Sequence, residues 1–313
     1  MSDVEKAMAR LVHSLLPHEQ VHINVLNEAH RRHVEAVLHL SANLASRVHF
    51  HPIPTNDAWI RDHGAIIVLE RHPEGWKRKA LNWSYNAWGG KYPPWDLDNQ
   101  VPCHMARILG IPCEDAPLVL EGGAIEGNGE GLLLTTSCLL EPHRNPGHTR
   151  ESIAAILQQQ MGVRDVLWLE GELTGDDTDG HIDQLVRFVD ASTVVVAVEH
   201  DPTAPHYPSL QEMHRQIELY ARKYGLEVID LPLPEAIYIR DQRMPASYAN
   251  FYIANQTVVV PTFGVPEDIR TLELFQRVFP SRKVVGIDCR EVIWGLGAIH
   301  CLTQQIPALP VTN

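Results

Sequence analysis

Four residues whose side chains can perform covalent chemistry lie in glycine-punctuated segments far apart in the sequence. Cys301 lies in the run Gly295-Leu-Gly-Ala-Ile-His-Cys-Leu-Thr-Gln-Gln, and Asp62 lies in Trp59-Ile-Arg-Asp-His-Gly. His181 and Asp183 end the segment Gly175-Asp-Asp-Thr-Asp-Gly-His-Ile-Asp. A thiol, an imidazole and two carboxylates can supply a nucleophile, an acid/base and a holder for a cation.

This set of groups suits a guanidinium, which is planar, always charged and rich in N–H donors. Two aspartates can hold it by charge-assisted hydrogen bonds, which places its carbon over the Cys301 sulfur. A thiolate, favoured by the cation and by an adjacent imidazolium, attacks that carbon. His181 protonates the leaving ammonia, a thiouronium remains, and water activated by His181 releases a ureido product. This scheme predicts a guanidine-modifying hydrolase that needs no cofactor.

Other interpretations of the same residues stay open. A lone thiol such as Cys301 is most often a buried structural cysteine, although the small residues Gly295, Gly297 and Ala298 favour close approach of a ligand. We expect Cys301 at the start of an apolar strand. We also expect His181 and Asp183 to alternate on a strand, with both side chains on one face.

The aspartates of segment 176–183 are compatible with a solvated loop or with an oxygen cage for a hard cation. The segment lacks the spacing of an EF-hand and runs directly into the predicted strand. We therefore predict no metal site.

Composition restricts the partners. The chain has 313 residues, of which 44% are hydrophobic and 21% charged, and its net charge is −13. The negative charge disfavours nucleic acid and anionic membranes and suits a small cationic substrate, although an acidic surface also serves solubility alone. The sequence has no apolar run of about 18 residues that would span a membrane and no secretory signal pattern, so we expect a cytoplasmic protein.

The cysteines also argue for a reducing compartment. They form an odd set without a C-x-x-C pair, which predicts neither a zinc site nor a disulfide framework. Four of them lack the context of Cys301, and we expect these to be structural: Cys103, Cys113, Cys138 and Cys289.

Short apolar runs alternate with amphipathic segments along the whole chain, which predicts an α/β fold in one domain, residues 1–313. Helices are predicted over 28–46, 100–109, 149–161, 210–224 and 267–279. Strands are predicted over 21–26, 48–53, 65–70, 81–85, 132–140, 163–169, 181–189, 193–198, 226–231, 283–288 and 299–304, with a hairpin over 250–261. The spacing indicates a structural repeat and a five-fold ring of α/β units whose loops surround a central channel. A doubly wound sheet is the competing architecture, but the phosphate-binding glycine motifs typical of that fold are absent from the sequence.

Six motifs, in this order, resemble the agmatine deiminase and bacterial peptidyl-arginine deiminase family. They are Trp59-Ile-Arg-Asp-His-Gly, Asn86-Ala-Trp-Gly-Gly-Lys, Leu120-Glu-Gly-Gly, Asp176-Asp-Thr-Asp-Gly-His-Ile-Asp, Asn250-Phe-Tyr-Ile-Ala-Asn and Ile299-His-Cys-Leu-Thr-Gln-Gln. The resemblance extends from about residue 20 to residue 307. It implies the pentein fold, a pseudo-symmetric five-bladed α/β propeller.

The resemblance also implies a role for each matching residue. Cys301 is the nucleophile, His181 is the acid/base, and Asp62 and Asp183 hold the guanidinium. The implied substrate-side residues are Glu121 at the guanidinium, Trp59 on the aliphatic chain, Asp177 near a distal amine, and Trp88 and Asn250.

The chain departs from the family pattern at three places. It does not show the Trp- and Pro-rich segment with which the family usually opens, so we expect a first blade that lacks a strand. The glycine-rich segment before the catalytic cysteine reads Gly295-Leu-Gly-Ala, which changes the channel mouth. Asp177 is one methylene shorter than the glutamate usual at that position, which changes its distance to a distal amine.

The best single substrate is agmatine, hydrolysed to N-carbamoylputrescine and ammonia, a reaction of putrescine biosynthesis in polyamine metabolism. An alternative is free or peptidyl-arginine, whose carboxylate would need a cation such as Arg61, Arg144, Arg240 or Arg243. Amidine transfer to an amine is also open to the same residues. Two other classes are a non-catalytic pentein binding module and a metal-binding protein that uses segment 176–183. A homo-oligomer is compatible with the sequence.

Overall fold

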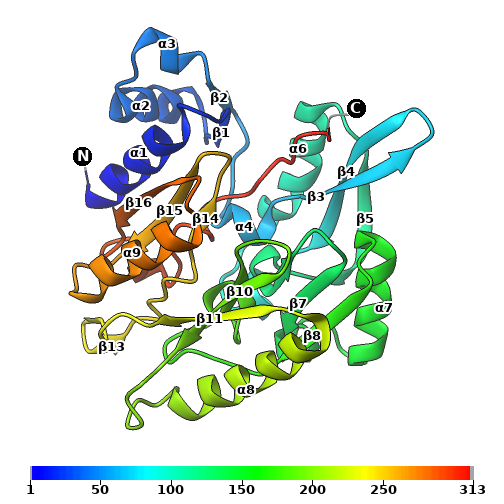
Figure 1. Cartoon of the computed structure of the whole chain (residues 1–313). Coiled ribbons are helices and arrows are strands. Elements are labelled where there is room, and N and C mark those ends of the chain that lie inside the picture. The colour runs from blue at the N-terminus through cyan, green and yellow to red at the C-terminus, as the bar shows by residue number, and fades with distance from the viewer. Residues whose placement is uncertain (1, 311–313) are drawn as a thin grey trace.

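The computed structural model, which describes residues 2–310, contains four three-stranded sheets that share one topology (Figure 1). In each sheet the first strand pairs antiparallel with the second, and a helix then leads to a third strand parallel to the second. The first of these units has β3 (Ile66–His72), β4 (Gly75–Ser84), α6 (Val101–Leu109) and β5 (Cys113–Val119). The second has β6 (Ile125–Gly127), β7 (Leu132–Thr136), α7 (Arg150–Met161) and β8 (Asp165–Leu169). The third has β9 (Val186–Phe188), β10 (Thr193–Val198), α8 (Tyr207–Tyr224) and β11 (Glu227–Pro232), and the fourth has β14 (Tyr252–Ile253), β15 (Thr257–Thr262), α9 (Glu267–Val278) and β16 (Lys283–Asp288).

The N-terminal unit has one strand fewer. Helix α1 (Asp3–Leu15) precedes β1 (Val21–Asn24), and α2 (Glu28–Leu38) and the short α3 (Ala42–Ala45) connect β1 to the parallel strand β2 (Val48–His51). Within residues 2–310 this sheet has no antiparallel third strand. The apolar face of α1 compensates by packing on the last unit, because Leu11 and Leu15 share one core with Val259 of β15 and Ile287 of β16. Figure 1 shows α1 beside this C-terminal sheet.

Local sequence signals explain where the elements begin and end. A capping box joins Ser2 and Glu5 at the start of α1. Gly110, Gly162 and Gly225 end α6, α7 and α8 in the left-handed conformation that glycine adopts without strain. Strand β10 is buried along its whole length, which explains its nearly continuous run of valines.

Several predicted elements differ from the structure. The helix predicted over 28–46 ends at Leu38, where His39 takes a left-handed conformation, and resumes as α3. The strand predicted over 132–140 ends at Thr136 and continues as a 3₁₀ turn, η3 (Ser137–Leu140). The prediction of a strand over 181–189 was wrong for its first half, which is the 3₁₀ turn η4 (Ile182–Gln184), and segment 299–304 is a turn rather than a strand. Both segments mix apolar and polar residues without a regular period, so their sequence does not separate a strand from a turn.

Smaller elements complete the structure. They are α4 (Ile60–His63), α5 (Ala87–Gly90), the hairpin β12 (Tyr238–Ile239) with β13 (Gln242–Arg243), and the 3₁₀ turns η1 (Asp98–Gln100), η2 (Gly122–Ala124) and η5 (Ile293–Gly295).

In the described part of the chain, no helix combines the length and the apolar character needed to cross a membrane.

Candidate active site

The predicted catalytic residues lie on short turns between the sheets rather than on the sheets themselves. Asp62 lies on α4, which begins directly after Trp59. His181 and Asp183 lie at the start of η4 and within it. Cys301 lies in the turn that follows η5. All four of these catalytic candidates are buried, so the fold has removed ionisable groups from water at one place.

Gly123, on η2, marks the point where three of these side chains converge. A Cβ atom at this position would lie 2.7 Å from Nδ1 of His181, 2.8 Å from Oδ1 of Asp62 and 3.1 Å from Oδ2 of Asp183. The backbone N–H of Gly123 donates a hydrogen bond of 2.9 Å to Oδ1 of Asp62. Only glycine fits, because any side chain would occupy the space between the three groups. Sequence analysis missed Gly123; the only signal was the Gly-Gly pair after Glu121, which is also common in plain turns.

Cys301 adjoins this group through Asp183. Its Sγ lies 3.6 Å from Oδ2 of Asp183, and its backbone carbonyl accepts a hydrogen bond from the N–H of Arg61. The indole of Trp59 lies against the loop before the cysteine, where a Cβ at Gly295 or Gly297 would come within 2.7 or 2.6 Å of the ring. The structure therefore joins the segment of Asp62 to the segment of Cys301.

Burial sets the protonation of the acids and the thiol. It raises the pKa of Asp183 to about 7, against the opposing influence of Arg187 and Arg61. Burial, and then the neighbouring Asp183, raises the pKa of Asp62 well above its ordinary value. Burial and both carboxylates likewise raise the pKa of the Cys301 thiol well above its ordinary value. A cation placed among these groups would therefore stabilise their ionised forms.

His181 is a neutral imidazole in this environment. Burial, and then the positive charge of Arg144, lowers the pKa of His181 well below its ordinary value. Its Nδ1 lies 3.8 Å from Oδ1 of Asp62, and its Nε2 lies 4.0 Å from Oε2 of Glu121, without a hydrogen-bond partner among the described residues. Burial and Arg144 thus outweigh Asp179 and disfavour the imidazolium that was expected to favour the thiolate.

Glu121 forms a buried ion pair with an arginine. The Nε of Arg144 donates to both carboxylate oxygens of Glu121, at 2.8 and 3.1 Å, and both side chains are fully buried. Arg144 also donates to Oδ2 of Asp179 at 2.7 Å and to the carbonyl of Thr178 at 2.9 Å. Sequence analysis considered Arg144 only as a cation for a substrate carboxylate; the structure instead places it behind Glu121, where it holds the aspartate-rich loop.

Trp88 lies beside Asp62. Its indole Nε1 donates a hydrogen bond of 3.0 Å to Oδ2 of Asp62. With φ of 55° and ψ of 47°, its backbone is in the left-handed region. The backbone N–H of Gly123 and the indole N–H of Trp88 thus hold the two oxygens of this carboxylate. Trp88 orients Asp62, a contact that the sequence motif did not indicate.

The aspartates before His181 turn toward different protein donors. Asp176 accepts hydrogen bonds from Thr178 and from the backbone of Gly180. Asp177 accepts from the hydroxyl of Tyr92. Asp179 is held by Arg144 and by Lys91, the latter at 2.8 Å. In residues 2–310, His, Cys, Asp and Glu side chains do not gather in threes or more in a way that would hold a metal ion.

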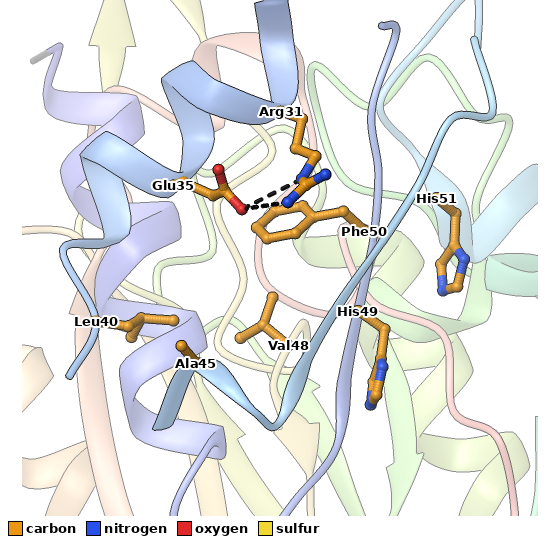
Figure 2. A pocket seen from close by; sticks show the side chains of 8 residues that line it. All are labelled: Arg31, Glu35, Leu40, Ala45, Val48, His49, Phe50 and His51. Carbon is orange, nitrogen blue, oxygen red and sulfur yellow. Dashed lines mark hydrogen bonds and ion pairs between the residues drawn. The ribbon is translucent and has the colours of Figure 1, made fainter. Parts of the chain in front are cut away.

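One pocket lies away from these residues. A groove of ≈ 520 Å³ lies beside α2, α3 and β2, and Figure 2 shows the Arg31–Glu35 ion pair and Phe50 at its side. Its lining is Arg31, Glu35, Leu40, Ala45, Val48, His49, Phe50 and His51, none of which is a predicted site residue. The convergent ionisable groups, rather than this groove, have the chemistry of an active site.

The other four cysteines are free thiols. The sulfurs of Cys103 on α6 and Cys113 on β5 lie 2.7 Å from each other as free thiols. Cys138 and Cys289 are buried in the cores.

Comparison with known proteins gives one consistent result. A family model described as Porphyromonas-type peptidyl-arginine deiminase matches residues 1–307. A curated relative named "Putative agmatine deiminase", from Marinomonas sp. (strain MWYL1), is 37% identical over 281 residues, which covers 82% of this chain and 75% of the relative.

Two solved structures are similar over nearly the whole chain. One is described as the putative arginine deiminase from Porphyromonas gingivalis, and its sequence is 38% identical. The superposition covers 98% of this chain and 90% of that chain, with a TM-score of 0.90. The other is the agmatine deiminase of Enterococcus faecalis, described as catalysing its reaction, and its sequence is 29% identical. The superposition covers 97% of this chain and 87% of that chain, with a TM-score of 0.88.

Proposed function

Since this chain belongs to the Porphyromonas-type peptidyl-arginine deiminase family and is a hydrolytic C–N deiminase acting on guanidines, we propose that its substrate is agmatine. The products are N-carbamoylputrescine and ammonia, so the reaction serves putrescine biosynthesis. One observation carries the proposal: Asp62, His181 and Asp183 converge on Gly123, with the Cys301 sulfur 3.6 Å from Asp183.

The guanidinium is held by Asp62 and Asp183. Both carboxylates are buried, and burial raises the pKa of each, so a cation between them restores their ionised forms. The same cation offsets the two negative charges that oppose ionisation of Cys301. The substrate thereby supplies the positive charge that favours the thiolate, a role for which the neutral His181 is unsuited.

The chemical steps then use Cys301 and His181. The thiol proton passes to His181, and the thiolate sulfur forms a bond to the guanidinium carbon. His181 gives that proton to the departing nitrogen, the C–N bond breaks, and ammonia leaves a thiouronium on Cys301. His181 next takes a proton from water, whose oxygen attacks the same carbon; the C–S bond breaks, and His181 returns the proton to the sulfur. The second proton of the water passes from the ureido oxygen to solvent, where ammonia takes it up as ammonium. Neither electrons nor a cofactor are consumed.

The rest of the substrate extends away from the thiol. Trp59 contacts the aliphatic chain, and Asp177, fixed by the Tyr92 hydroxyl, faces the distal amine. Free arginine would bring a carboxylate to this end. Two nearby cations are already engaged, because Arg144 binds Glu121 and Asp179 while Lys91 binds Asp179. This pairing supports a substrate without a carboxylate.

We place these residues in a five-bladed pentein propeller formed by the four three-stranded units and the two-stranded N-terminal unit. The turns that carry the site face the axis of that propeller. The whole chain, residues 1–313, acts as one catalytic domain.

A substrate panel tests the function. Purified protein is incubated with agmatine, free arginine and a peptide that ends in arginine, and ammonia release is measured. We expect the highest kcat/KM with agmatine. A higher value with either arginine compound would transfer the proposal to that substrate, and no release from any of them would refute it.

A further inference from the structure

The side chain of Asn250 lies beneath the turn that carries Cys301. Asn250 is 1% exposed and precedes β14 in the fourth three-stranded unit. Its Oδ1 accepts hydrogen bonds from three backbone N–H groups of the turn, those of Ala298 at 3.2 Å, His300 at 3.0 Å and Cys301 at 3.3 Å. One buried side chain thus satisfies the donors of the turn that presents the thiol.

The other half of the same amide faces the reactive groups. Its Nδ2 lies 3.0 Å from Sγ of Cys301 and 3.4 Å from Oδ2 of Asp183. The orientation of the amide follows from its surroundings, because backbone N–H groups only donate and therefore require the oxygen on their side. The two N–H bonds of Nδ2 are consequently directed toward the sulfur and the carboxylate.

We propose that Asn250 is a positioning residue for the nucleophile: its Oδ1 holds the turn, and its Nδ2 donates the hydrogen bond that stabilises the Cys301 thiolate. This differs from the expected contact with the substrate. It rests on the proposed function only in taking Cys301 as the nucleophile.

The surrounding charges make such a donor important. Burial, Asp183 and Asp62 all raise the pKa of the thiol, whereas the hydrogen bond from Asn250 lowers it, more than the backbone N–H of Ala298 does. A hydrogen bond to a charged acceptor is about twice as strong as one between neutral groups. Loss of the donor therefore affects the thiolate more than the thiol.

Substitution by aspartate separates the two halves of the amide. Asn250→Asp keeps an oxygen acceptor for the turn but replaces the donor with a carboxylate beside Asp183. Asn250→Ala removes both halves without adding a charge. Asn43→Asp is the matched control for added charge, because Asn43 is an exposed residue of α3 in the N-terminal unit.

The test measures the rate at which iodoacetamide alkylates Cys301 without substrate at about pH 8, a pH below the raised pKa of this thiol, where the rate follows the thiolate fraction. Mass spectrometry of the peptide that contains residue 301 separates it from the other cysteines. For Asn250→Asp we expect a rate about tenfold lower, which corresponds to a rise of about one unit in the pKa of the thiol. Asn250→Ala should also lower the rate, and Asn43→Asp should match the unmodified protein.

Circular dichroism and thermal melting identify the variants that keep the native fold. An unchanged alkylation rate in a natively folded Asn250 variant overturns the proposal. Failure of the unmodified protein to release ammonia would refute the proposed function and leave this result intact, because alkylation reports the thiol itself.

Discussion

The Nδ1 of His300 forms a hydrogen bond of 2.7 Å with Oδ2 of Asp183, the same oxygen that lies 3.6 Å from the sulfur of Cys301. Burial lowers the pKa of His300 well below its ordinary value, so a neutral imidazole makes this contact. The residue before the nucleophile therefore orients one of the two carboxylates that flank the proposed guanidinium. Nucleophile and carboxylate are positioned together rather than independently.

Loss of the sulfur should abolish turnover. We expect Cys301→Ala and Cys301→Ser to release no ammonia from agmatine, because no covalent intermediate can form. Asp62→Asn should lower kcat/KM by at least about a hundredfold, because one charge of the cation holder is lost. Steady-state ammonia release measures both, and full turnover by either cysteine variant would exclude the mechanism.

Agmatine binding should weaken in acid. The pKa of Asp183 is raised to about 7, so protonation below that pH removes one of the charges proposed to bind the guanidinium. We expect the Kd for agmatine to rise by up to about tenfold per pH unit as the pH falls below about 7. Calorimetry with Cys301→Ala isolates binding from turnover. A Kd that stays constant from pH 8 to pH 5.5 would show that Asp183 does not titrate in this range.

Asp183 should also reduce stability at neutral pH. A buried carboxyl whose pKa is raised holds its proton more tightly in the folded state, so its stabilising contribution is complete below the unfolded pKa and disappears as the pH rises to about 7. The Asp183→Asn variant lacks this ionisation. The difference between its free energy of unfolding and that of the unmodified protein should therefore rise by about 3 kcal/mol from about pH 4 to about pH 8. Urea denaturation at both pH values measures this gain. An equal effect at both would contradict the assigned pKa.

Gly123 should tolerate no side chain. Gly123→Ala places a methyl within 2.7 to 3.1 Å of three site atoms, so we expect kcat/KM to fall by about a hundredfold or more. Gly127→Ala is the matched control, because its methyl would meet Leu133 at an ordinary 3.5 Å. Similar activities of the two alanine variants would show that the space at Gly123 is not used by the substrate.

The role of Asp177 can be separated from catalysis. Asp177→Ala should raise KM for agmatine about tenfold more than KM for an alkylguanidine that lacks the distal amine, since only agmatine loses an ion pair. Equal effects on the two substrates would remove Asp177 from amine recognition and leave its contact with Tyr92 as a purely structural one.

The sequence by itself determined the residue types and the order of the elements. Cys301, His181, Asp62 and Asp183 were selected by chemistry and motif, and the alternation of strands and helices indicated the α/β repeat that the sheets display. These features depend on local periodicity and on side-chain chemistry, both of which are present in a linear chain.

Tertiary structure decided what each group touches. The Asn250 contacts with Cys301, the Gly123 convergence and the Arg144–Glu121 pair join residues that are distant along the chain or lie on different turns. Such contacts depend on how separate units pack, and burial then moves pKa values in directions that composition does not reveal. Segment 181–189 is a further case. All of its residues are buried, and only the packed structure distinguishes the turn at its start from the predicted strand.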